Sequence, residues 1–118
     1  MQNTVGIFIS NKSAAFYSIM GILNRQGLKV VHVNELDSAV KMLASNPNWK
    51  PVLYLDLSDQ GLLEEYLDQK LNLQERCKNV HGFIGQDSTM SGRLLQSYGL
   101  IPHVIDFEIS PKQAHDNP

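Results

Sequence analysis

The carboxylate of Asp56 is the side chain that the sequence places best for chemistry. It falls within the apolar run Val52-Leu53-Tyr54-Leu55-Asp56-Leu57, which follows Pro51 and precedes Ser58-Asp59-Gln60-Gly61. An apolar run of this length between turn residues is typical of a strand buried on both faces. Asp56 lies near the carboxyl end of that strand, where open α/β sheets hold their sites. A carboxylate there can take part in a reaction, or it can cap the next turn by accepting backbone N–H groups.

The other reactive side chains are scattered along the chain. Cys77 is the only cysteine, and no Cys or His partner lies near it in the sequence, so we expect a small apolar filler rather than a reactive thiol. The histidines are His32, His81, His103 and His115. Because they lack the spacing of metal ligands, no metal site is predicted. No glycine-rich run opens a helix, so no phosphate-binding loop or cofactor is predicted either.

Apolar strand-like segments alternate with segments of helical periodicity. Strands are predicted at 5–9, 28–33, 52–57, 80–85 and within 101–107, and helices are predicted around apolar stripes at 15–23, 36–43, 62–71 and 94–98. This alternation predicts an α/β fold with a doubly wound, flavodoxin-like sheet of five parallel strands in the order 2-1-3-4-5. A last helix can begin at Ser110-Pro111, but only about two turns fit before Pro118, so it is expected to be short or missing.

Two of the predicted helices have apolar stripes that should face the sheet. The third helix is expected to bury its stripe of leucines and one tyrosine: Leu62, Leu63, Tyr66, Leu67 and Leu71. The fourth helix is expected to begin at Asp87 or Ser88 and to end at Gly99, with a core stripe of Leu94, Leu95 and Tyr98.

The composition is that of one globular domain. The chain has 118 residues, 42% of them hydrophobic and 19% charged, which is enough to bury a core. Its ten basic and twelve acidic residues are spread along the sequence, so direct nucleic-acid binding is not predicted. No apolar run approaches the ~20 residues of a membrane span, and the single cysteine favours a cytoplasmic protein. The domain is expected to cover residues 1–112, with 113–118 as a tail or the start of a linker.

With Leu55-Asp56-Leu57 closing the third strand, the chain resembles a receiver domain of bacterial response regulators from Val5 to about Pro111. The resemblance implies that Asp56 occupies the position that accepts a phosphoryl group from a histidine kinase. That reaction needs a divalent cation and neighbouring positive charge to neutralise the phosphoryl oxygens. The positions that supply these groups in receivers are therefore the ones to compare.

The first strand ends without the acidic pair that holds the metal in receivers. Ser10 and Asn11 stand at these positions, followed by Lys12, and no acidic residue precedes Glu35. Since Mg²⁺ prefers carboxylate oxygens, the resemblance predicts that its main ligands are lost.

The ends of the fourth and fifth strands also depart from the family's pattern. The Ser or Thr that binds the phosphoryl group in receivers corresponds to Gly85, and the conserved lysine of the family corresponds to Asp106. The aromatic switch residue corresponds to Val104. An anion in place of the lysine would repel a phosphoaspartate, although Asp56 and Asp106 together could hold a cation in a rearranged site.

These departures predict a degenerate receiver, or pseudo-receiver, that is not an enzyme and uses no cofactor. It would be the N-terminal regulatory domain of a larger bacterial regulator, acting by homodimerisation or by docking onto an attached output domain. In receivers the usual interaction face is built by helix four, strand five and helix five. With the last helix short, the candidate surface residues are Tyr98, Ile101, Pro102 and Val104.

Two other functions stay open. The first is a conventional receiver in which Asp56 still accepts a phosphoryl group. The second is a small-ligand sensor, because residues 5–15 also resemble the start of amino-acid-binding ACT domains. Those domains follow strand two with an antiparallel strand, whereas this chain places a helix at 36–43 before its third strand.

Overall fold

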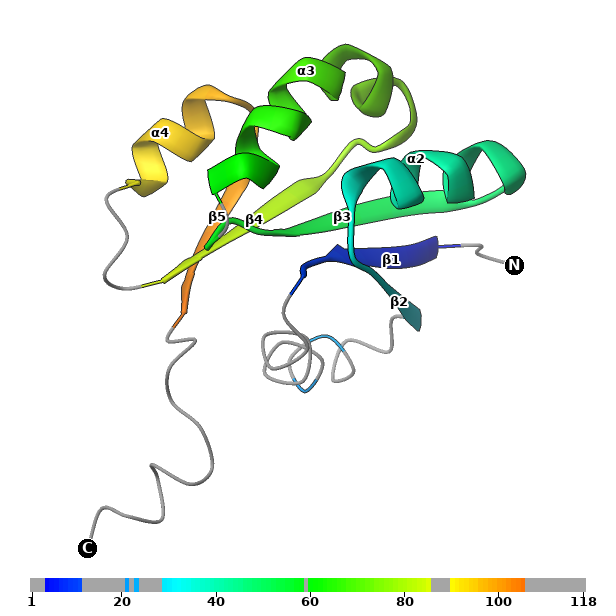
Figure 1. The fold of residues 1–118 in the computed structure, drawn as a ribbon, viewed down its shortest axis with the longest axis horizontal. Helices are drawn as coiled ribbons and strands as arrows, with labels where there is room; N and C mark the ends of the chain where they lie inside the picture. Colours follow the sequence, from blue (N-terminus) through cyan, green and yellow to red (C-terminus); the bar gives the residue numbers. More distant parts are fainter. Residues whose placement is uncertain are drawn as a thin grey trace, which may run out of the picture.

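The computed structural model describes residues 4–11, 21, 23, 29–58, 60–85 and 90–105. Its elements are β1 (Thr4–Ile9), β2 (Lys29–Val33), α2 (Leu36–Ser45), β3 (Lys50–Asp56), α3 (Gln60–Arg76), β4 (Val80–Gly85), α4 (Gly92–Ser97) and β5 (Ile101–Ile105) (Figure 1). Most of the helix predicted at 15–23, the last helix predicted from Ser110-Pro111, Asp106 and the domain end at residue 112 lie outside the described residues.

The five strands form one sheet in the order β2-β1-β3-β4-β5, and every neighbouring pair is parallel. The predicted flavodoxin-like α/β fold is therefore confirmed, with β3 at the centre of the sheet. The ACT-like topology is wrong, because it requires an antiparallel partner after strand two. The helix α2 instead carries the chain back, so that β3 runs in the same direction as β1.

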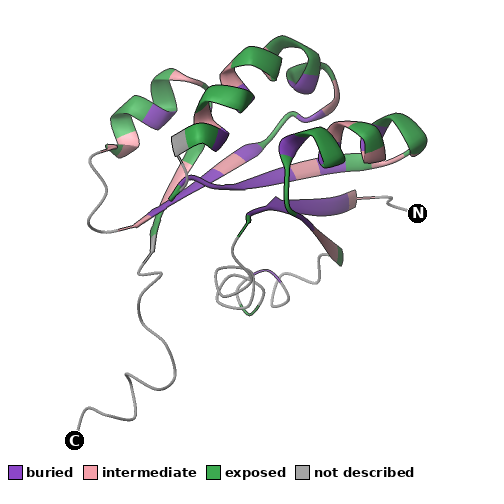
Figure 2. Cartoon of the chain, in the orientation of Figure 1, coloured by how far each residue is buried: buried purple, intermediate pink, exposed green. Residues whose placement is uncertain are grey.

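The described helices α2, α3 and α4 all cover one face of the sheet (Figure 1). Alternate strand residues such as Ile7 and Leu53 point toward these helices and form the main core. Phe8, Tyr54 and Phe83 belong to a second buried cluster on the opposite face. Figure 2 shows buried residues along the central strands and exposed residues on the outer sides of the helices. Both faces of the sheet are thus apolar, as expected for parallel strands.

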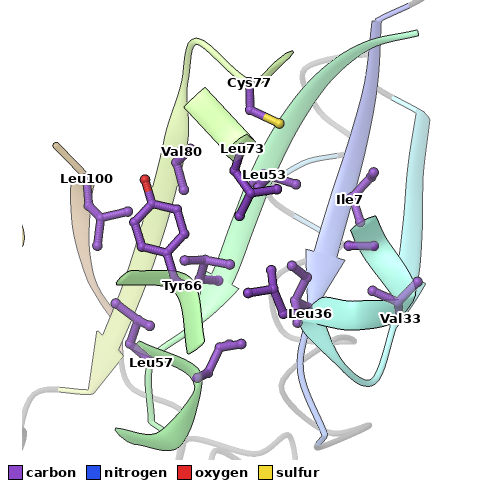
Figure 3. Close-up of a cluster of buried hydrophobic side chains, with 14 of the residues drawn as sticks. Ile7, Val33, Leu36, Leu53, Leu57, Tyr66, Leu73, Cys77, Val80 and Leu100 are labelled. Atoms are coloured by element: carbon purple, nitrogen blue, oxygen red, sulfur yellow. The ribbon is translucent and has the colours of Figure 1, made fainter. Parts of the chain in front are cut away.

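Helix α3 buries Leu62, Tyr66 and Leu73. Figure 3 shows Tyr66 and Leu73 within the core between this helix and the sheet. These residues share one stripe because steps of four and seven residues return to the same side of an α-helix. The prediction that Leu71 belongs to this stripe is wrong, since its side chain is 81% exposed. Leu71 lies about 180° around the helix from Leu62 at 100° per residue.

Helix α4 starts later than predicted. Its N-cap is Ser91, whose side chain accepts a hydrogen bond from the Leu94 backbone N–H at 3.1 Å, so the expected caps Asp87 and Ser88 are wrong. Leu95 is buried, whereas Leu94 is exposed, so only part of the predicted stripe faces the core. Gly99 follows the helix with φ of 81°, a left-handed conformation that glycine adopts without strain.

Arg76 joins the end of α3 to the end of α2. Its guanidinium donates to the carbonyl oxygens of Leu43 at 2.8 Å and of Asn46 and Trp49 at 3.1 Å each. These carbonyls belong to the helix end and the turn that lead into β3, so Arg76 helps to fix the start of the central strand. Within the described ranges, no helix has the length and apolarity needed to span a membrane.

Candidate functional site

Asp56 is the last residue of β3 and lies at the carboxyl edge of the sheet, as the sequence predicts. A cleft of about 450 Å³ opens there, bounded by the ends of β1 and β3 and by the starts of α2 and α3. Its described lining residues are Ser10, Asn11, Asn34, Glu35, Asp37, Asp56, Leu62 and Glu65. The side chain of Asp56 lies at the bottom of this cleft and is only 1% exposed.

Both oxygens of the Asp56 carboxylate accept hydrogen bonds from serines. The Ser10 hydroxyl donates to Oδ2 at 2.6 Å. Ser58 donates to Oδ1 twice, from its backbone N–H at 3.1 Å and from its hydroxyl at 2.6 Å. A buried carboxylate is costly unless its oxygens are satisfied, and these three donors satisfy both.

Local sequence explains why the two serines reach Asp56. Ser58 follows Asp56 by two residues, the spacing at which an aspartate accepts the backbone N–H of the next turn. Ser10 directly follows β1, whose Ile9 is in register with Leu55 of β3, so the carboxyl ends of these two strands lie side by side. The Ser10 N–H donates to the Val33 carbonyl of β2 at 3.0 Å, which fixes Ser10 from the other side. Asp56 therefore caps its own turn, one of the roles that its position in the sequence suggests.

The residues predicted to surround Asp56 are only partly gathered there. Ser10 lies in contact with the carboxylate, and exposed Asn11 lines the cleft. Gly85 ends β4 at the same edge of the sheet but is not among the described lining residues. Asp106 falls outside the described residues, so the two-aspartate cation site stays a prediction.

The cleft holds acidic side chains that the sequence reasoning did not assign to it. Glu35 and Asp37 come from the start of α2, and Glu65 comes from the first turns of α3. The signal was present, because helices that follow β2 and β3 begin at the same sheet edge as Asp56. Asp37 pairs with Lys41 at 3.1 Å. Within the part of the chain that the structure describes, no three metal-ligating side chains lie close enough to hold an ion.

The predicted interaction surface is exposed in part. Val104 is 60% exposed and Ile101 is 41% exposed, while Tyr98 and Pro102 are half-buried. Pro102 lies against Gly92 of α4, so alternation along β5 turns Val104 toward the α4 side and Ile101 toward the opposite face. Apolar side chains are thus exposed on both faces of the last strand in the described sheet.

A row of aromatic rings crosses the face opposite the described helices. Phe8 contacts His32 and Phe83, with ring centres 5.8 and 6.3 Å apart. Tyr54 lies 4.8 Å from His81, and Phe83 lies 4.9 Å from His103. Sequence reasoning treated these histidines as isolated. The strand order brings them to one face, because His81 and His103 lie on the neighbouring strands β4 and β5.

The two histidines form a hydrogen bond, His81 Nδ1 to His103 Nε2, at 2.8 Å. Burial lowers the pKa of both imidazoles, and the neighbouring His103 lowers that of His81 further. Burial also raises the pKa of Tyr54, so its phenol stays protonated near neutral pH. In the main core, Cys77 is buried, as expected for an apolar filler, and burial raises its pKa to about 11.

A comparison with protein-family models finds no match to this chain, and a search of curated proteins finds no similar sequence.

Proposed function

We propose that this chain is a receiver-like signalling module that works by binding another protein surface rather than by accepting a phosphoryl group on Asp56. The observation that carries the proposal is the hydrogen bonding of Asp56. Ser10 and Ser58 occupy both carboxylate oxygens, and the side chain is 1% exposed. A phosphoacceptor must present one oxygen to the donor and the other to a cation. Here both directions are taken by hydroxyl groups.

The charges around the cleft support the same conclusion. Glu35, Asp37 and Glu65 line it together with Asp56, and its described lining residues include no lysine or arginine. An anionic phosphodonor would enter a field of negative charge without a cation to offset it. The carboxylate is therefore assigned a structural role, which is to hold the ends of β1 and β3 together.

The binding surface is assigned to α4 and β5. Three of the four large hydrophobic side chains exposed among the described residues lie there: Leu94, Ile101 and Val104. A strand at the sheet edge that exposes apolar side chains is prone to contact another chain. The proposed partner is a second copy of the domain, with an attached output domain of a larger cytoplasmic regulator as the alternative occupant.

The test is the oligomeric state of the purified chain by sedimentation equilibrium over a wide concentration range. Self-association is expected, and Val104→Asp should weaken it because a carboxylate in the interface must be desolvated without a partner. The matched control is Leu71→Asp, which changes an exposed leucine on α3 that is not part of the α4–β5 surface. A wild-type chain that stays monomeric at millimolar concentration, and captures no segment of its parent protein, would refute the proposal.

A conventional phosphoacceptor is the second candidate, and the acidic cleft is the observation that favours it. Carboxylates from α2 and α3 could attract Mg²⁺ even though the residues after β1 are not acidic. Incubation with acetyl phosphate and Mg²⁺, followed by intact-mass measurement, separates the candidates. Addition of one phosphoryl group to the wild type, and none to Asp56→Asn, would establish the phosphoacceptor function and exclude the proposal that Asp56 is not phosphorylated.

A further inference from the structure

The contact between His81 and His103 is a head-to-head hydrogen bond, not a stack of two rings. The facing nitrogens are 2.8 Å apart, and the ring centres are 5.0 Å apart with planes inclined by 30°. Adding a ring radius of about 1.1 Å on each side of the nitrogen–nitrogen distance gives about 5.0 Å. The two nitrogens therefore lie close to the line that joins the ring centres. This is the geometry of a linear N–H···N bond.

Only one proton fits between the facing nitrogens. In the neutral pair one imidazole donates and the other accepts. A first added proton can bind at an outer nitrogen and leave an imidazolium donating to a neutral imidazole, which strengthens the bond. A second proton must bind at the accepting nitrogen, so two N–H groups and two positive charges would face each other across 2.8 Å.

The surroundings keep the rings in this arrangement. His81 lies flat against Tyr54 at 4.8 Å with an interplanar angle of 18°, and His103 lies flat against Phe83 at 4.9 Å with an angle of 22°. Tyr54 is the titratable side chain that the described residues bring against the pair, and its phenol stays neutral. No anion among these neighbours therefore offsets the positive charge that a second proton would add. Because each ring is held against an aromatic neighbour, repulsion between the two rings acts on the contact between β5 and β4.

The outer nitrogens give protons access to the pair. Among the described residues, the only buried side-chain nitrogen or oxygen without a hydrogen-bond partner is the Tyr66 hydroxyl. His81 Nε2 and His103 Nδ1 are not among these buried atoms, and both rings are half-buried rather than enclosed. The same linear geometry disfavours chelation of one metal ion by the facing nitrogens, because their lone pairs point along one line instead of converging.

We propose that His81 and His103 form a proton-sharing pair that makes the attachment of β5 to the sheet sensitive to pH. With up to one added proton, the pair holds β5 against β4. The second proton breaks the N–H···N bond and pushes His103, and with it β5, away from His81. Because β5 carries Ile101 and Val104, acidification would also alter the proposed interaction surface. Only this last step rests on the proposed function.

The direct test is NMR of the ¹⁵N-labelled chain across a pH titration. We expect a scalar coupling between His81 Nδ1 and His103 Nε2 near neutral pH, and its loss on acidification as both rings titrate in two linked steps. In His103→Phe, which keeps a ring against Phe83, His81 should titrate in one step. His32→Asn, on the same face but separated from β4 by the two strands β1 and β3, should leave the coupled titration unchanged.

Amide hydrogen exchange measures the consequence for β5. On acidification, the equilibrium constant for opening of β5 in the wild type should increase about tenfold for each unit by which the pKa of the second protonation is lowered. The exchange rates are first corrected for the intrinsic pH dependence of amide exchange. His103→Phe should remove this increase. The proposal would be overturned if the scalar coupling were absent. It would also be overturned if each histidine titrated independently, with no change when the other histidine is replaced. Since neither readout uses self-association, a failed dimerisation test would leave this result standing.

Discussion

Replacement of Asp56 distinguishes a structural carboxylate from a catalytic one by the sign of the change in stability. Asp56→Ala leaves the buried Ser10 hydroxyl, which is 2% exposed, without its acceptor. An orphaned buried donor costs about 1–3 kcal/mol, and a hydrogen bond to a charged group contributes about 1.5–3 kcal/mol. Ser58 is exposed, and its hydroxyl can bind water instead of Asp56, so loss of this hydrogen bond adds little to the cost. Because these two figures describe the same lost interaction and do not add, the expected destabilisation is about 2–3 kcal/mol.

Asp56→Asn is the graded variant. The amide keeps one oxygen acceptor, and the serine hydroxyl that faces its NH₂ group can rotate to accept instead of donate. The expected cost is about 1 kcal/mol, clearly less than for alanine. The free energy of unfolding is measured by urea denaturation with the slope checked for constancy, because a changed slope would mean a changed denatured state.

Ser10→Ala completes the design. It removes one donor and should cost about 1.5–3 kcal/mol, and the double variant with Asp56→Ala should cost less than the sum of the two singles. Ser45→Ala, on an exposed serine near the end of α2, is the matched control and should fall within about 0.5 kcal/mol of the wild type. If Asp56→Ala or Asp56→Asn stabilised the protein, the carboxylate would be under the strain typical of an active site, and the structural role would be refuted.

Four further outcomes are expected. Burial lowers the pKa of His81 and His103 below the ordinary 6.5, so the unfolded chain binds more protons than the folded chain. The free energy of unfolding should therefore fall as the pH drops below about 6.5, and it should level off below the folded-state pKa values. His103→Phe should flatten this profile, which is measured as the urea midpoint at each pH. Arg76→Lys keeps the charge but loses the fork that reaches three carbonyls, and should lower the unfolding free energy by about 1–2 kcal/mol. Tyr66→Phe should be neutral or stabilise by up to about 1 kcal/mol, because the buried Tyr66 hydroxyl has no hydrogen-bond partner. Burial raises the pKa of Tyr66 and Gln74 partly lowers it, but Gln74 does not stand in hydrogen-bonding geometry. Cys77, with a pKa of about 11, should resist alkylation at pH 8 until urea unfolds the chain, so fast labelling of the native protein would contradict its burial.

The sheet was predictable from sequence because each strand carries its own signal. Apolar runs separated by helical segments indicate parallel strands buried on both faces, and short connections restrict their order. The position of Asp56 follows from the same pattern, since it closes the central run. Helix faces were harder to predict. In α3 leucines occur on several sides of the helix, so Leu71 resembles a core residue until the stripe of Leu62, Tyr66 and Leu73 is fixed by contact with the sheet.

The histidine pair depends on information that a local pattern does not contain. Strand order places β4 beside β5, and alternation places His81 and His103 on one face. Their contact also needs the register, in which His103 is opposite Phe83 and His81 is opposite Ile101. A shift of one residue in β5 would turn His103 to the other face. The serines around Asp56 are similar, since Ser10 reaches it only through the pairing of β1 with β3.

Ser10 connects the acidic cleft to the aromatic face of the sheet. Its hydroxyl donates to Asp56 at 2.6 Å, and its carbonyl oxygen lies 2.9 Å from Nε2 of His32. Since a carbonyl only accepts, that nitrogen carries the proton and the His32 ring is held in one tautomer and orientation. His32 in turn contacts Phe8, which also contacts Phe83 in the aromatic row. Two direct hydrogen bonds of Ser10, one from its hydroxyl and one to its carbonyl oxygen, thus fix the end of β1 between the cleft and the aromatic face.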